Sequence, residues 1–329
     1  MNDGIKEKDV EKMKRIAMSL ILLASIFVVA ACGNKADTKG ESSKHSEKAT
    51  TITVKDQNGE VKVPLKPKRV VVFDMGMLDT IQALGESDQV VGVAKDNLPT
   101  YLKEFKADKF ESAGGIKEPD FEKINALKPD LIIISGRQED SMDELKKIAP
   151  TLYLATDSKD IWNSIKTNIT TIGTIFDKAD EAKKKLDELS NEISKVSTKA
   201  KSEDLKTLTV LVNEGSLSAY GEGSRFAILN DVFGFGLADP AIEASTHGQS
   251  VTYEYVLEKD PDVLFVIDRT KAIGGDTSKD NVSENELVQQ TKAFKNKKII
   301  TLKPDVWYLS GGGLTSTKLM LDEAKKVVE

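Results

Sequence analysis

Two segments of the chain repeat one pattern at a constant offset of 132 residues. The first runs from Glu122 to Arg137 (EKINALKPDLIIISGR) and the second from Glu254 to Arg269 (EYVLEKDPDVLFVIDR). Each opens on Glu, has Pro-Asp seven and eight residues later, continues as an apolar run and closes on Arg. The pattern predicts a helix that ends at the proline and a buried strand that follows it. A chain built on two such units is expected to fold as two related α/β lobes.

Short apolar runs rich in β-branched residues alternate with amphipathic segments from residue 51 onward. Continuous apolar strands separated by helices are typical of parallel sheets, so the predicted fold class is α/β. Two alternating runs in 52–63 flank Asn58-Gly59 and predict a β-hairpin. The other strands are expected at 70–73, 90–94, 131–134, 152–154, 208–212, 263–267 and 298–301.

Residues 160–200 interrupt this alternation, because they contain no proline and only one glycine, Gly173. Their isoleucines recur at helical spacing, and a polar, heptad-like pattern follows. We expect one long helix here, kinked near Asp177. The chain is therefore predicted to have an N-terminal lobe at 51–158, a connecting helical region at 159–203 and a C-terminal lobe at 204–329.

The N-terminal region predicts export from the cell. Lys14-Arg15 precedes an almost wholly apolar stretch, Ile16–Ala31, which ends in small residues. Such a stretch is typical of a signal peptide and is too short for a comfortable membrane span. The charged residues before Met13 do not fit an export signal, which favours Met13 over Met1 as the start.

Cys32 is the only cysteine of the chain, and it follows Val29-Ala30-Ala31. This quartet resembles the bacterial lipoprotein box. The resemblance implies a signal peptide of residues 1–31 and a lipid on Cys32 that anchors the protein to the outer face of a cell membrane, as on a Gram-positive-type surface. The alternative is an ordinary signal peptide with an incidental cysteine. Because 33–50 contains no large apolar side chain, residues 32–50 are predicted to be a disordered tether.

Arginine is rare in this chain, with five residues against 42 lysines. Because lysine supplies the routine surface charge, each arginine is a candidate for bidentate recognition of anionic oxygens. Arg137 and Arg269 each follow a predicted strand, at the sheet edge where ligands bind in α/β folds. Arg225 follows a glycine-rich turn, and Ser224 is predicted to cap a helix that begins there. Arg69 is expected to be an ordinary surface cation.

The two predicted lobes, the helical connector and the lipid tether together resemble the substrate-binding lipoproteins of ABC importers, in the class whose lobes are joined by one long helix (class III). The segment 118–130 (EPDFEKINALKPD) is similar to a signature of ferric siderophore, haem and cobalamin binders. The resemblance covers 50–329 and implies two Rossmann-like lobes with mainly parallel sheets. It also implies a monomeric receptor that delivers an iron(III)-siderophore to a membrane permease with a separate ATPase, and that holds no permanent cofactor.

The resemblance also implies roles for single residues. Catecholate siderophore binders of this class have three arginines, which Arg137, Arg225 and Arg269 match in place, and such cations suit an anionic ferric catecholate. In some of these binders a histidine and a tyrosine, which His247 and Tyr308 match, ligate the iron directly when the siderophore is tetradentate. Imidazole and phenolate are suitable Fe(III) ligands. From the residues alone, a loop histidine is more often an ordinary surface residue.

Glu122 and Glu254, which open the two copies of the repeat, match the acidic residues by which similar receptors dock onto basic pockets of the permease. The alternative is that both are exposed glutamates in a first helical turn, where a negative charge favours the helix dipole.

Other function classes find little support in the sequence. The motifs G-x-S-x-G and H-E-x-x-H and the phosphate-binding loop are absent, so an enzyme, including a siderophore esterase, is disfavoured. The net charge is −6 and no basic block follows the signal region, so nucleic acid is not an expected partner. A single histidine in the folded part argues against a bare zinc or manganese site. The open alternative is another chelate, namely a hydroxamate or citrate siderophore, haem or cobalamin.

Overall fold

The computed structural model describes residues 50–329, which lie in one compact unit, Lys48–Glu329. The predicted signal peptide, the predicted lipidation site Cys32 and the tether up to residue 49 lie outside the described residues. Within the part that the structure describes, no helix is long and apolar enough to cross a membrane.

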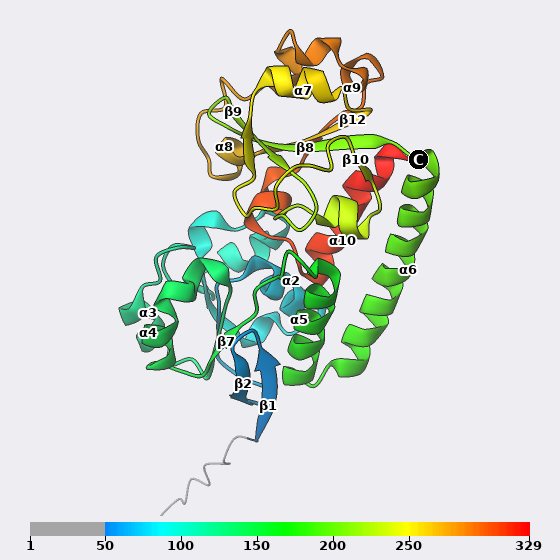
Figure 1. Ribbon diagram of the computed structural model, residues 1–329. Helices are drawn as coiled ribbons and strands as arrows, with labels where there is room; N and C mark the ends of the chain where they lie inside the picture. Colours follow the sequence, from blue (N-terminus) through cyan, green and yellow to red (C-terminus); the bar gives the residue numbers. More distant parts are fainter. Residues whose placement is uncertain (1–49) are drawn as a thin grey trace, which may run out of the picture. The chain divides into compact units, whose positions relative to one another are not determined.

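The N-terminal lobe is built on a five-stranded sheet with the order β5-β4-β3-β6-β7, and all of its neighbouring strands are parallel. The central strands β3 and β6 consist of valine, leucine and isoleucine residues that are all buried. Strands that are apolar on both faces need cover on both sides, and helices flank this sheet in Figure 1. The strands are β3 Val70–Val72, β4 Val90–Val93, β5 Glu111–Ser112, β6 Leu131–Ile134 and β7 Thr151–Tyr153.

The predicted hairpin is confirmed, with β1 (Thr51–Asp56) antiparallel to β2 (Gly59–Pro64). The turn residues are Gln57 and Asn58, one residue earlier than expected, because Gly59 already pairs with Asp56. The Asp56 carboxylate fixes this turn by accepting a hydrogen bond from the backbone N–H of Asn58 (2.8 Å). Gly59 has a φ of 121°, which favours glycine at the start of β2.

The C-terminal lobe contains a six-stranded sheet with the order β11-β9-β8-β12-β13, and β10 pairs with β8. Strands β8, β10, β12 and β13 are parallel, whereas β9 and β11 are antiparallel to their neighbours. The prediction of mainly parallel sheets is therefore confirmed, with one antiparallel edge. The strands are β8 Lys206–Asn213, β9 Ser216–Tyr220, β10 Gly236–Leu237, β11 Gln249–Val251, β12 Val263–Asp268 and β13 Ile299–Leu302.

The two copies of the repeat occupy equivalent places in the two sheets. Helix α3 (Phe121–Ala126) precedes β6, which pairs with β3. Helix α7 (Tyr253–Lys259) precedes β12, which pairs with β8. All seven strands that the sequence predicted outside the hairpin are present, with ends within two residues of the expected positions.

The Asp of each Pro-Asp pair has the same structural task. Asp130 accepts hydrogen bonds from the backbone N–H groups of Lys68 (2.7 Å) and Arg69 (3.0 Å), just before β3. Asp262 accepts one from the backbone N–H of Lys206 (2.9 Å), at the start of β8. Each carboxylate thus holds the entry of the strand beside its own, which explains why the repeat retains an acid at this position.

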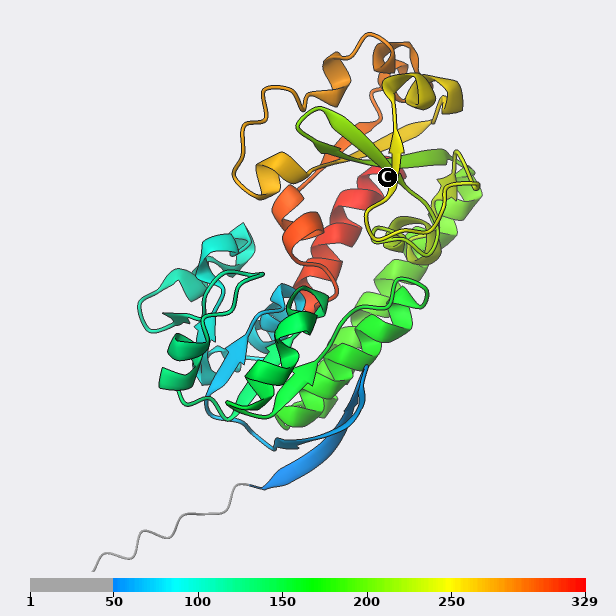
Figure 2. The same ribbon diagram turned by 60° about the vertical axis from the view of Figure 1, so that its left-hand side comes forward.

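Residues 160–200 form two helices, α5 (Ile161–Ile175) and α6 (Ala179–Glu203), so the prediction of one helix over this whole region is wrong. The prediction that one long helix connects the lobes is confirmed by α6. The chain reverses at Asp177, which has a left-handed φ of 56°, where only a kink was expected. The two helices pack against each other, and Figures 1 and 2 both show them side by side. Gly173 makes this possible, since a Cβ there would lie 2.5 Å from the Cβ of Ala182. The longer helix, α6, leads into β8 and is the connector between the sheets.

The last helix, α10 (Leu314–Ala324), follows the C-terminal sheet in sequence but packs against α2 (Met75–Ala83) of the N-terminal lobe and against α6. A Cβ on Gly76 would overlap the backbone of Gly311, and a Cβ on Gly313 would overlap the carbonyl oxygen of Gly76. The two backbones therefore touch where α2 begins and α10 begins. The remaining α-helices of residues 50–329 are α4 Met142–Lys146, α8 Arg269–Ala272 and α9 Lys292–Lys295.

Candidate functional site

Three of the arginines singled out in the sequence meet at Tyr308. Arg137 Nη2 donates to the backbone carbonyl of Tyr308 at 2.7 Å, and Arg225 Nη2 donates to the same oxygen at 2.6 Å. Arg269 Nε donates to the phenolic oxygen of Tyr308 at 2.8 Å. The guanidinium carbons of Arg225 and Arg269 lie 4.3 and 5.7 Å from the centre of the tyrosine ring. We call these four residues the arginine–tyrosine cluster.

The ends of β6 and β12 place two of these arginines as the repeat predicted. Arg137 lies three residues after β6, in the 3₁₀ turn 136–141, and Arg269 is the first residue of α8, directly after β12. Both side chains are half-buried. Because parallel strands end at the same sheet edge, one arginine from each sheet reaches the shared site.

Arg225 reaches the cluster from a turn, and the predicted capping role of Ser224 is wrong. The hydroxyl of Ser224 donates back to the carbonyl of Gly221 (2.5 Å) and does not accept an N–H of a following helix. The helical residues that follow form a π-helical turn, Ile228–Val232, with no side-chain cap. Ser224 is fully buried and closes the glycine-rich turn from inside, whereas the adjacent Arg225 is half-buried and reaches Tyr308.

Tyr308 lies on the π-helical turn Asp305–Leu309, which follows the C-terminal sheet but is held by the N-terminal lobe. Asp305 accepts a hydrogen bond from the backbone N–H of Thr100 at 2.8 Å. The hydroxyl of Ser310 lies 2.9 Å from the hydroxyl of Tyr101, within hydrogen-bond distance. The neighbouring Trp307 is buried and donates its indole N–H to Glu323 of α10 (2.8 Å). The backbone that presents Tyr308 is therefore fixed on both sides.

The fully buried carboxylate of Asp79, on α2, anchors the start of α10. It accepts hydrogen bonds from the backbone N–H groups of Thr315 (2.9 Å) and Ser316 (3.0 Å), and from the hydroxyl of Tyr101 (3.1 Å). The first N–H groups of a helix have no partner within it, so a carboxylate from another element can satisfy them. Burial nevertheless raises the pKa of Asp79 to about 7, against the opposing effect of these donors.

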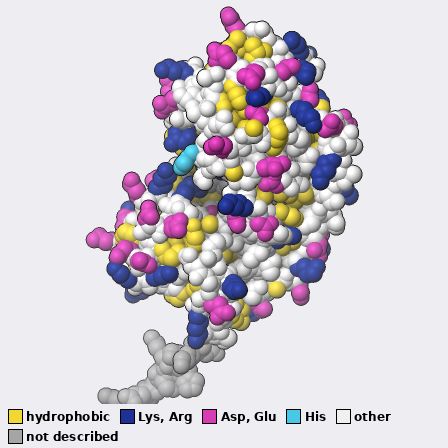
Figure 3. Space-filling view, viewed as in Figure 1, with side chains coloured by type: hydrophobic (Ala, Val, Ile, Leu, Met, Phe, Trp, Pro, Cys, Tyr) yellow, Lys and Arg dark blue, Asp and Glu magenta, His cyan; other side chains and the backbone are white. Residues whose placement is uncertain are grey.

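The cluster is strongly cationic. In the part of the chain that the structure describes, none of its three guanidinium groups forms an ion pair with Asp or Glu. Burial and then repulsion from Arg225 lower the pKa of Arg137, and only Asp74 and Tyr308 act against this. Figure 3 shows a hollow on one face of the molecule with Lys and Arg side chains at its rim. The arrangement is suited to an anion with several oxygen atoms.

The phenol of Tyr308 is tuned by its neighbours. Burial by itself raises the pKa of Tyr308, but the hydrogen bond from Arg269 and the charges of Arg225 and Arg269 outweigh burial, so the net pKa is lowered. A phenol with a lowered pKa loses its proton more readily and becomes a better ligand for a hard trivalent metal.

Asn213, at the end of β8, is a site residue that we did not predict. Its side-chain oxygen accepts a hydrogen bond from Arg269 Nη1 at 2.5 Å, so Arg269 is held between Asn213 and Tyr308. The sequence did offer a signal, because Asn213 is the polar residue that directly ends the apolar run of β8. The same signal identified Arg137 and Arg269.

His247 is exposed, and its imidazole makes no hydrogen bond among the described residues. Its loop is nevertheless fixed, because the hydroxyl of Tyr220 donates to the backbone carbonyl of His247 (2.9 Å). Gly248, at a φ of 76°, lies against the ring of Tyr220, and a Cβ there would overlap the ring. The structure thus brings Arg137, Arg225, Arg269 and Tyr308 together but leaves the side chain of His247 outside this contact. Among the described residues, no group of three or more His, Cys, Asp or Glu could hold a metal ion.

Glu122 and Glu254 lie in the first turns of α3 and α7 and are both exposed. Asp120 and Thr252 are the N-cap residues of these helices and accept hydrogen bonds from backbone N–H groups. Since the helix starts are already capped, the two glutamates are free to meet solvent or a partner.

Residues 70–306 match the family of periplasmic binding proteins. The chain belongs to this family. It is 46% identical over 317 residues to the petrobactin-binding protein YclQ of Bacillus subtilis (strain 168), and the match covers 96% of this chain and 100% of YclQ. The crystal structure of YclQ matches with a TM-score of 0.84 and 48% identity over 85% of this chain and 99% of that chain. These matches confirm the class III α/β fold that the sequence predicted.

Two further relatives show the range of ligands named for similar proteins. The ferric-anguibactin-binding protein FatB of Vibrio anguillarum (strain ATCC 68554 / 775) is 33% identical over 283 residues, covering 84% of this chain and 87% of FatB. The Fe(3+)-citrate-binding protein YfmC of Bacillus subtilis (strain 168) is 30% identical over 318 residues, covering 95% of this chain and 97% of YfmC. All three relatives are named for binding, none for catalysis.

Proposed function

We propose that this chain is the substrate-binding lipoprotein of an ABC importer and captures an anionic ferric catecholate-type siderophore for iron uptake. The observation that most supports the proposal is the convergence of Arg137, Arg225 and Arg269 on Tyr308, with no ion pair to Asp or Glu among the described residues. The similarity to petrobactin-binding YclQ supports the same ligand class. The protein binds and delivers its ligand and performs no catalysis.

When the ligand binds, the arginines exchange hydrogen bonds to a neutral carbonyl for stronger hydrogen bonds to anionic oxygens. In the ligand-free protein, Arg137 and Arg225 share one neutral carbonyl oxygen, so their charges repel each other. Catecholate oxygens bring negative charge to the same guanidinium groups and form charge-assisted hydrogen bonds, which are stronger than bonds to a neutral carbonyl. A ligand that lies among the arginines therefore gains both attraction and relief of repulsion.

Iron is the cargo, and Tyr308 and His247 are its proposed protein ligands when the siderophore is tetradentate. Such a chelate leaves two coordination positions open. The lowered pKa of Tyr308 favours the phenolate form that would bind Fe(III). The exposed loop of His247 leaves its imidazole free to approach a ligand in the site. A hexadentate siderophore needs neither residue as a metal ligand.

Delivery requires a permease and a separate ATPase. The exposed Glu122 and Glu254, one on each lobe and at equivalent places in the repeat, are the proposed docking residues for basic pockets of the permease. A lipid on Cys32, followed by the tether 32–50, would keep the receptor on the outer face of the membrane within reach of that permease. The receptor works as a monomer with lobes at 51–158 and 204–329 joined through 159–203.

The arginines provide the test. Arg137→Gln and Arg269→Gln should each weaken binding of a ferric tris-catecholate by about 1.5–3 kcal/mol, the cost of a lost charged hydrogen bond. This is roughly a 10- to 150-fold rise in Kd, measured by fluorescence quenching. Arg69→Gln is the matched control, because Arg69 is exposed and its guanidinium group donates, among the described residues, only to the carbonyl of Leu127. Equal, small losses in all three variants would show that the cluster does not bind the ligand.

A ferric citrate complex is the second candidate. It is favoured by the identity of 30% to YfmC and by the fact that a cationic site also suits a polycarboxylate. The two ligand classes are distinguished by direct comparison of their affinities.

A further inference from the structure

Asn213 is, among the described residues, the only side chain outside the arginine–tyrosine cluster that forms a hydrogen bond with one of its arginines. Its Oδ1 accepts a hydrogen bond from Nη1 of Arg269 at 2.5 Å, while the phenol of Tyr308 accepts one from Nε at 2.8 Å. A guanidinium group has only donors, so the amide must present its oxygen to it. Nη2 of Arg269 makes no hydrogen bond within residues 50–329, so both of its N–H groups remain available to a ligand.

The backbone around Asn213 is fixed by a tight turn. Asn213 ends β8 and pairs with the first residue of β9 across a two-residue turn, Glu214 and Gly215. Both turn residues have positive φ angles, 51° and 83°, which hairpin turns of type I′ require. The backbone N–H of Glu214 donates to the hydroxyl of Thr270 at 3.0 Å, and Thr270 directly follows Arg269. The turn and the start of α8 therefore hold each other, so the amide oxygen is already in place to receive Arg269.

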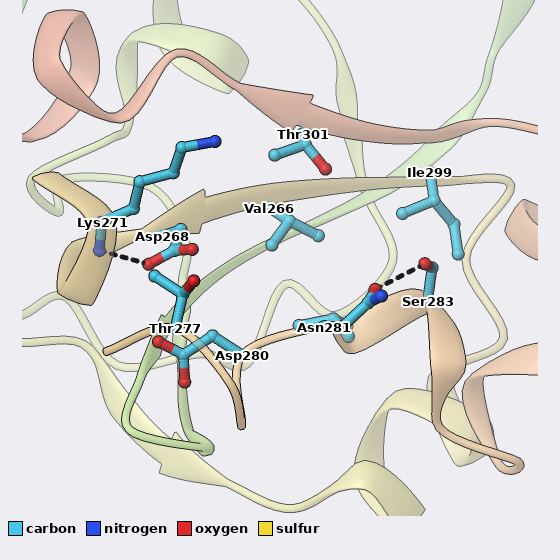
Figure 4. Close-up of a pocket in the computed structure, with 10 residues that line it drawn as sticks. Val266, Asp268, Lys271, Thr277, Asp280, Asn281, Ser283, Ile299 and Thr301 are labelled. Atoms are coloured by element: carbon cyan, nitrogen blue, oxygen red, sulfur yellow. Dashed lines mark hydrogen bonds between the residues drawn. The ribbon is translucent and has the colours of Figure 1, made fainter. Parts of the chain in front are cut away.

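Two acids near Arg269 have other partners and do not compensate its charge. Asp268 directly precedes Arg269, but its Oδ1 accepts the backbone N–H of Lys271 at 2.7 Å and so caps α8. Figure 4 shows Asp268 with Lys271 and Asp280 in a separate cavity of about 280 Å³, which no member of the cluster lines. Asp280 accepts the backbone N–H of Gly215 at 2.6 Å. Since neither acid forms an ion pair within the described residues, Arg269 is oriented by an amide and a phenol rather than by a carboxylate.

The need to orient Arg269 does not by itself explain an amide at this position. An aspartate has the same shape as an asparagine, and a charged acceptor forms the stronger hydrogen bond, so an aspartate would hold Arg269 at least as firmly. The two side chains differ in charge, because a carboxylate would pair with Arg269 and cancel one of the three positive charges of the cluster. The backbone carbonyls of Tyr308 and Leu309, which accept hydrogen bonds from the other two arginines, are neutral as well.

We propose that Asn213 determines the charge selectivity of the site, because it orients Arg269 through a neutral acceptor and so makes the receptor favour a multiply charged anionic chelate over a neutral one. Asn213 acts through Arg269 and is therefore a positioning residue. The inference rests on the proposed function, since it concerns the ligand that the arginine–tyrosine cluster binds. It adds that the selectivity depends on a residue whose exchange for an acid would keep the shape of the site and change only its charge.

The substitution Asn213→Asp tests this role, with affinities of the purified protein for a ferric tris-catecholate and a neutral ferric tris-hydroxamate measured by fluorescence quenching. The variant should bind the catecholate about 10- to 100-fold more weakly, whereas its Kd for the hydroxamate should change by less than about threefold. Asn213→Ala removes the acceptor but leaves the charge of Arg269 uncompensated, so it should weaken catecholate binding by only about two- to tenfold. A merely structural role would lower Tm and weaken the binding of both chelates alike.

Asn285→Asp is the matched control, because it adds the same charge to the same lobe away from the cluster. Asn285 is exposed, and its side-chain oxygen accepts the backbone N–H of Leu287 at 2.9 Å, which an aspartate can also accept. Both Kd values of this variant should stay within about twofold of the wild type, or roughly 0.4 kcal/mol.

The inference is overturned if Asn213→Asp binds the catecholate as tightly as the wild type, or no more weakly than Asn285→Asp. It is also overturned if Asn213→Ala weakens catecholate binding more than Asn213→Asp does. If Asn213→Asp does not fold, Asn213→Ala decides, since equal weakening of both chelates in that variant would refute charge selectivity. Failure of the wild type to bind the catecholate would instead overturn the proposed function, and this inference with it.

Discussion

The substitution Tyr308→Phe separates the two roles that we assign to Tyr308. It removes only the phenolic oxygen, which accepts a hydrogen bond from Arg269 Nε at 2.8 Å. The aromatic ring remains beside Arg225, and the backbone carbonyl remains available to Arg137 and Arg225. The variant therefore tests the hydroxyl without dismantling the rest of the cluster.

In the ligand-free protein, the loss of one hydrogen bond to a charged group should cost about 1.5–3 kcal/mol of folding free energy. For a chain of this size that corresponds to a fall in Tm of about 2–6 °C. A hexadentate ferric tris-catecholate supplies all six oxygens to the iron, so its Kd should change by less than about threefold, or roughly 0.6 kcal/mol. A ferric bis-catecholate would lose a protein ligand to the metal and should bind at least about tenfold more weakly, or roughly 1.4 kcal/mol.

The assay combines fluorescence quenching for affinity with visible absorption for coordination. In the wild type, binding of a bis-catecholate complex should shift the charge-transfer band of the iron, and Tyr308→Phe should remove part of this shift. His247→Ala should have a parallel effect if its imidazole occupies the sixth position. Equal weakening of both chelates, or a band that is identical in the variant, would refute direct ligation and leave Tyr308 as a partner of the arginines only.

Three further predictions concern the anchoring of α10 and the docking surface. Burial raises the pKa of Asp79 from 3.8 to about 7, so between these pH values the folded protein keeps a proton that the unfolded chain has released. The free energy of unfolding should therefore fall by roughly 4 kcal/mol as the pH rises from 4 to 7. In a plot of Tm against pH, Asp79→Asn should remove this fall. Gly76→Ala should lower Tm through overlap with the facing backbone, costing about 1–3 kcal/mol, whereas Gly115→Ala, which meets only atoms 3.9 Å away, should be almost neutral. Glu122→Gln together with Glu254→Gln should reduce iron uptake in cells while leaving siderophore affinity unchanged. Unchanged uptake would show that the two glutamates do not dock onto the permease and only favour the helix dipole.

The sequence predicted the arginines because their positions follow from a local rule. A polar residue that ends a buried parallel strand lies at the functional edge of the sheet, whatever the rest of the chain does. The structure confirms that Arg137 and Arg269 follow β6 and β12, whereas their role as ligand-binding residues stays a prediction. Applied more widely, the same rule would also have selected Asn213. The two strands of the repeat, and the central strands that pair with them, could also be predicted from the sequence, because their apolar runs are continuous.

Contacts between distant segments could not be predicted in the same way. Tyr308 and Arg137 are 171 residues apart, and their contact depends on a turn that Thr100 and Tyr101 hold against the N-terminal lobe. Helical periodicity continued through Asp177 because a reversal between two amphipathic helices leaves their apolar spacing intact. Ser224 was misassigned because a serine before a helix can turn its hydroxyl back to the preceding carbonyl as readily as forward.

The central claim is that the arginine–tyrosine cluster selects an anionic catecholate chelate, and a ligand panel tests it most directly. Quenching of the two tryptophans would be measured with a ferric tris-catecholate, a neutral ferric tris-hydroxamate and ferric citrate. We predict that the catecholate binds at least about 100-fold more tightly than the hydroxamate, equivalent to two charged hydrogen bonds of about 1.5 kcal/mol each. Equal affinity for the catecholate and the hydroxamate would contradict the claim. Tighter binding of ferric citrate would show that the site binds a polycarboxylate chelate, the second candidate.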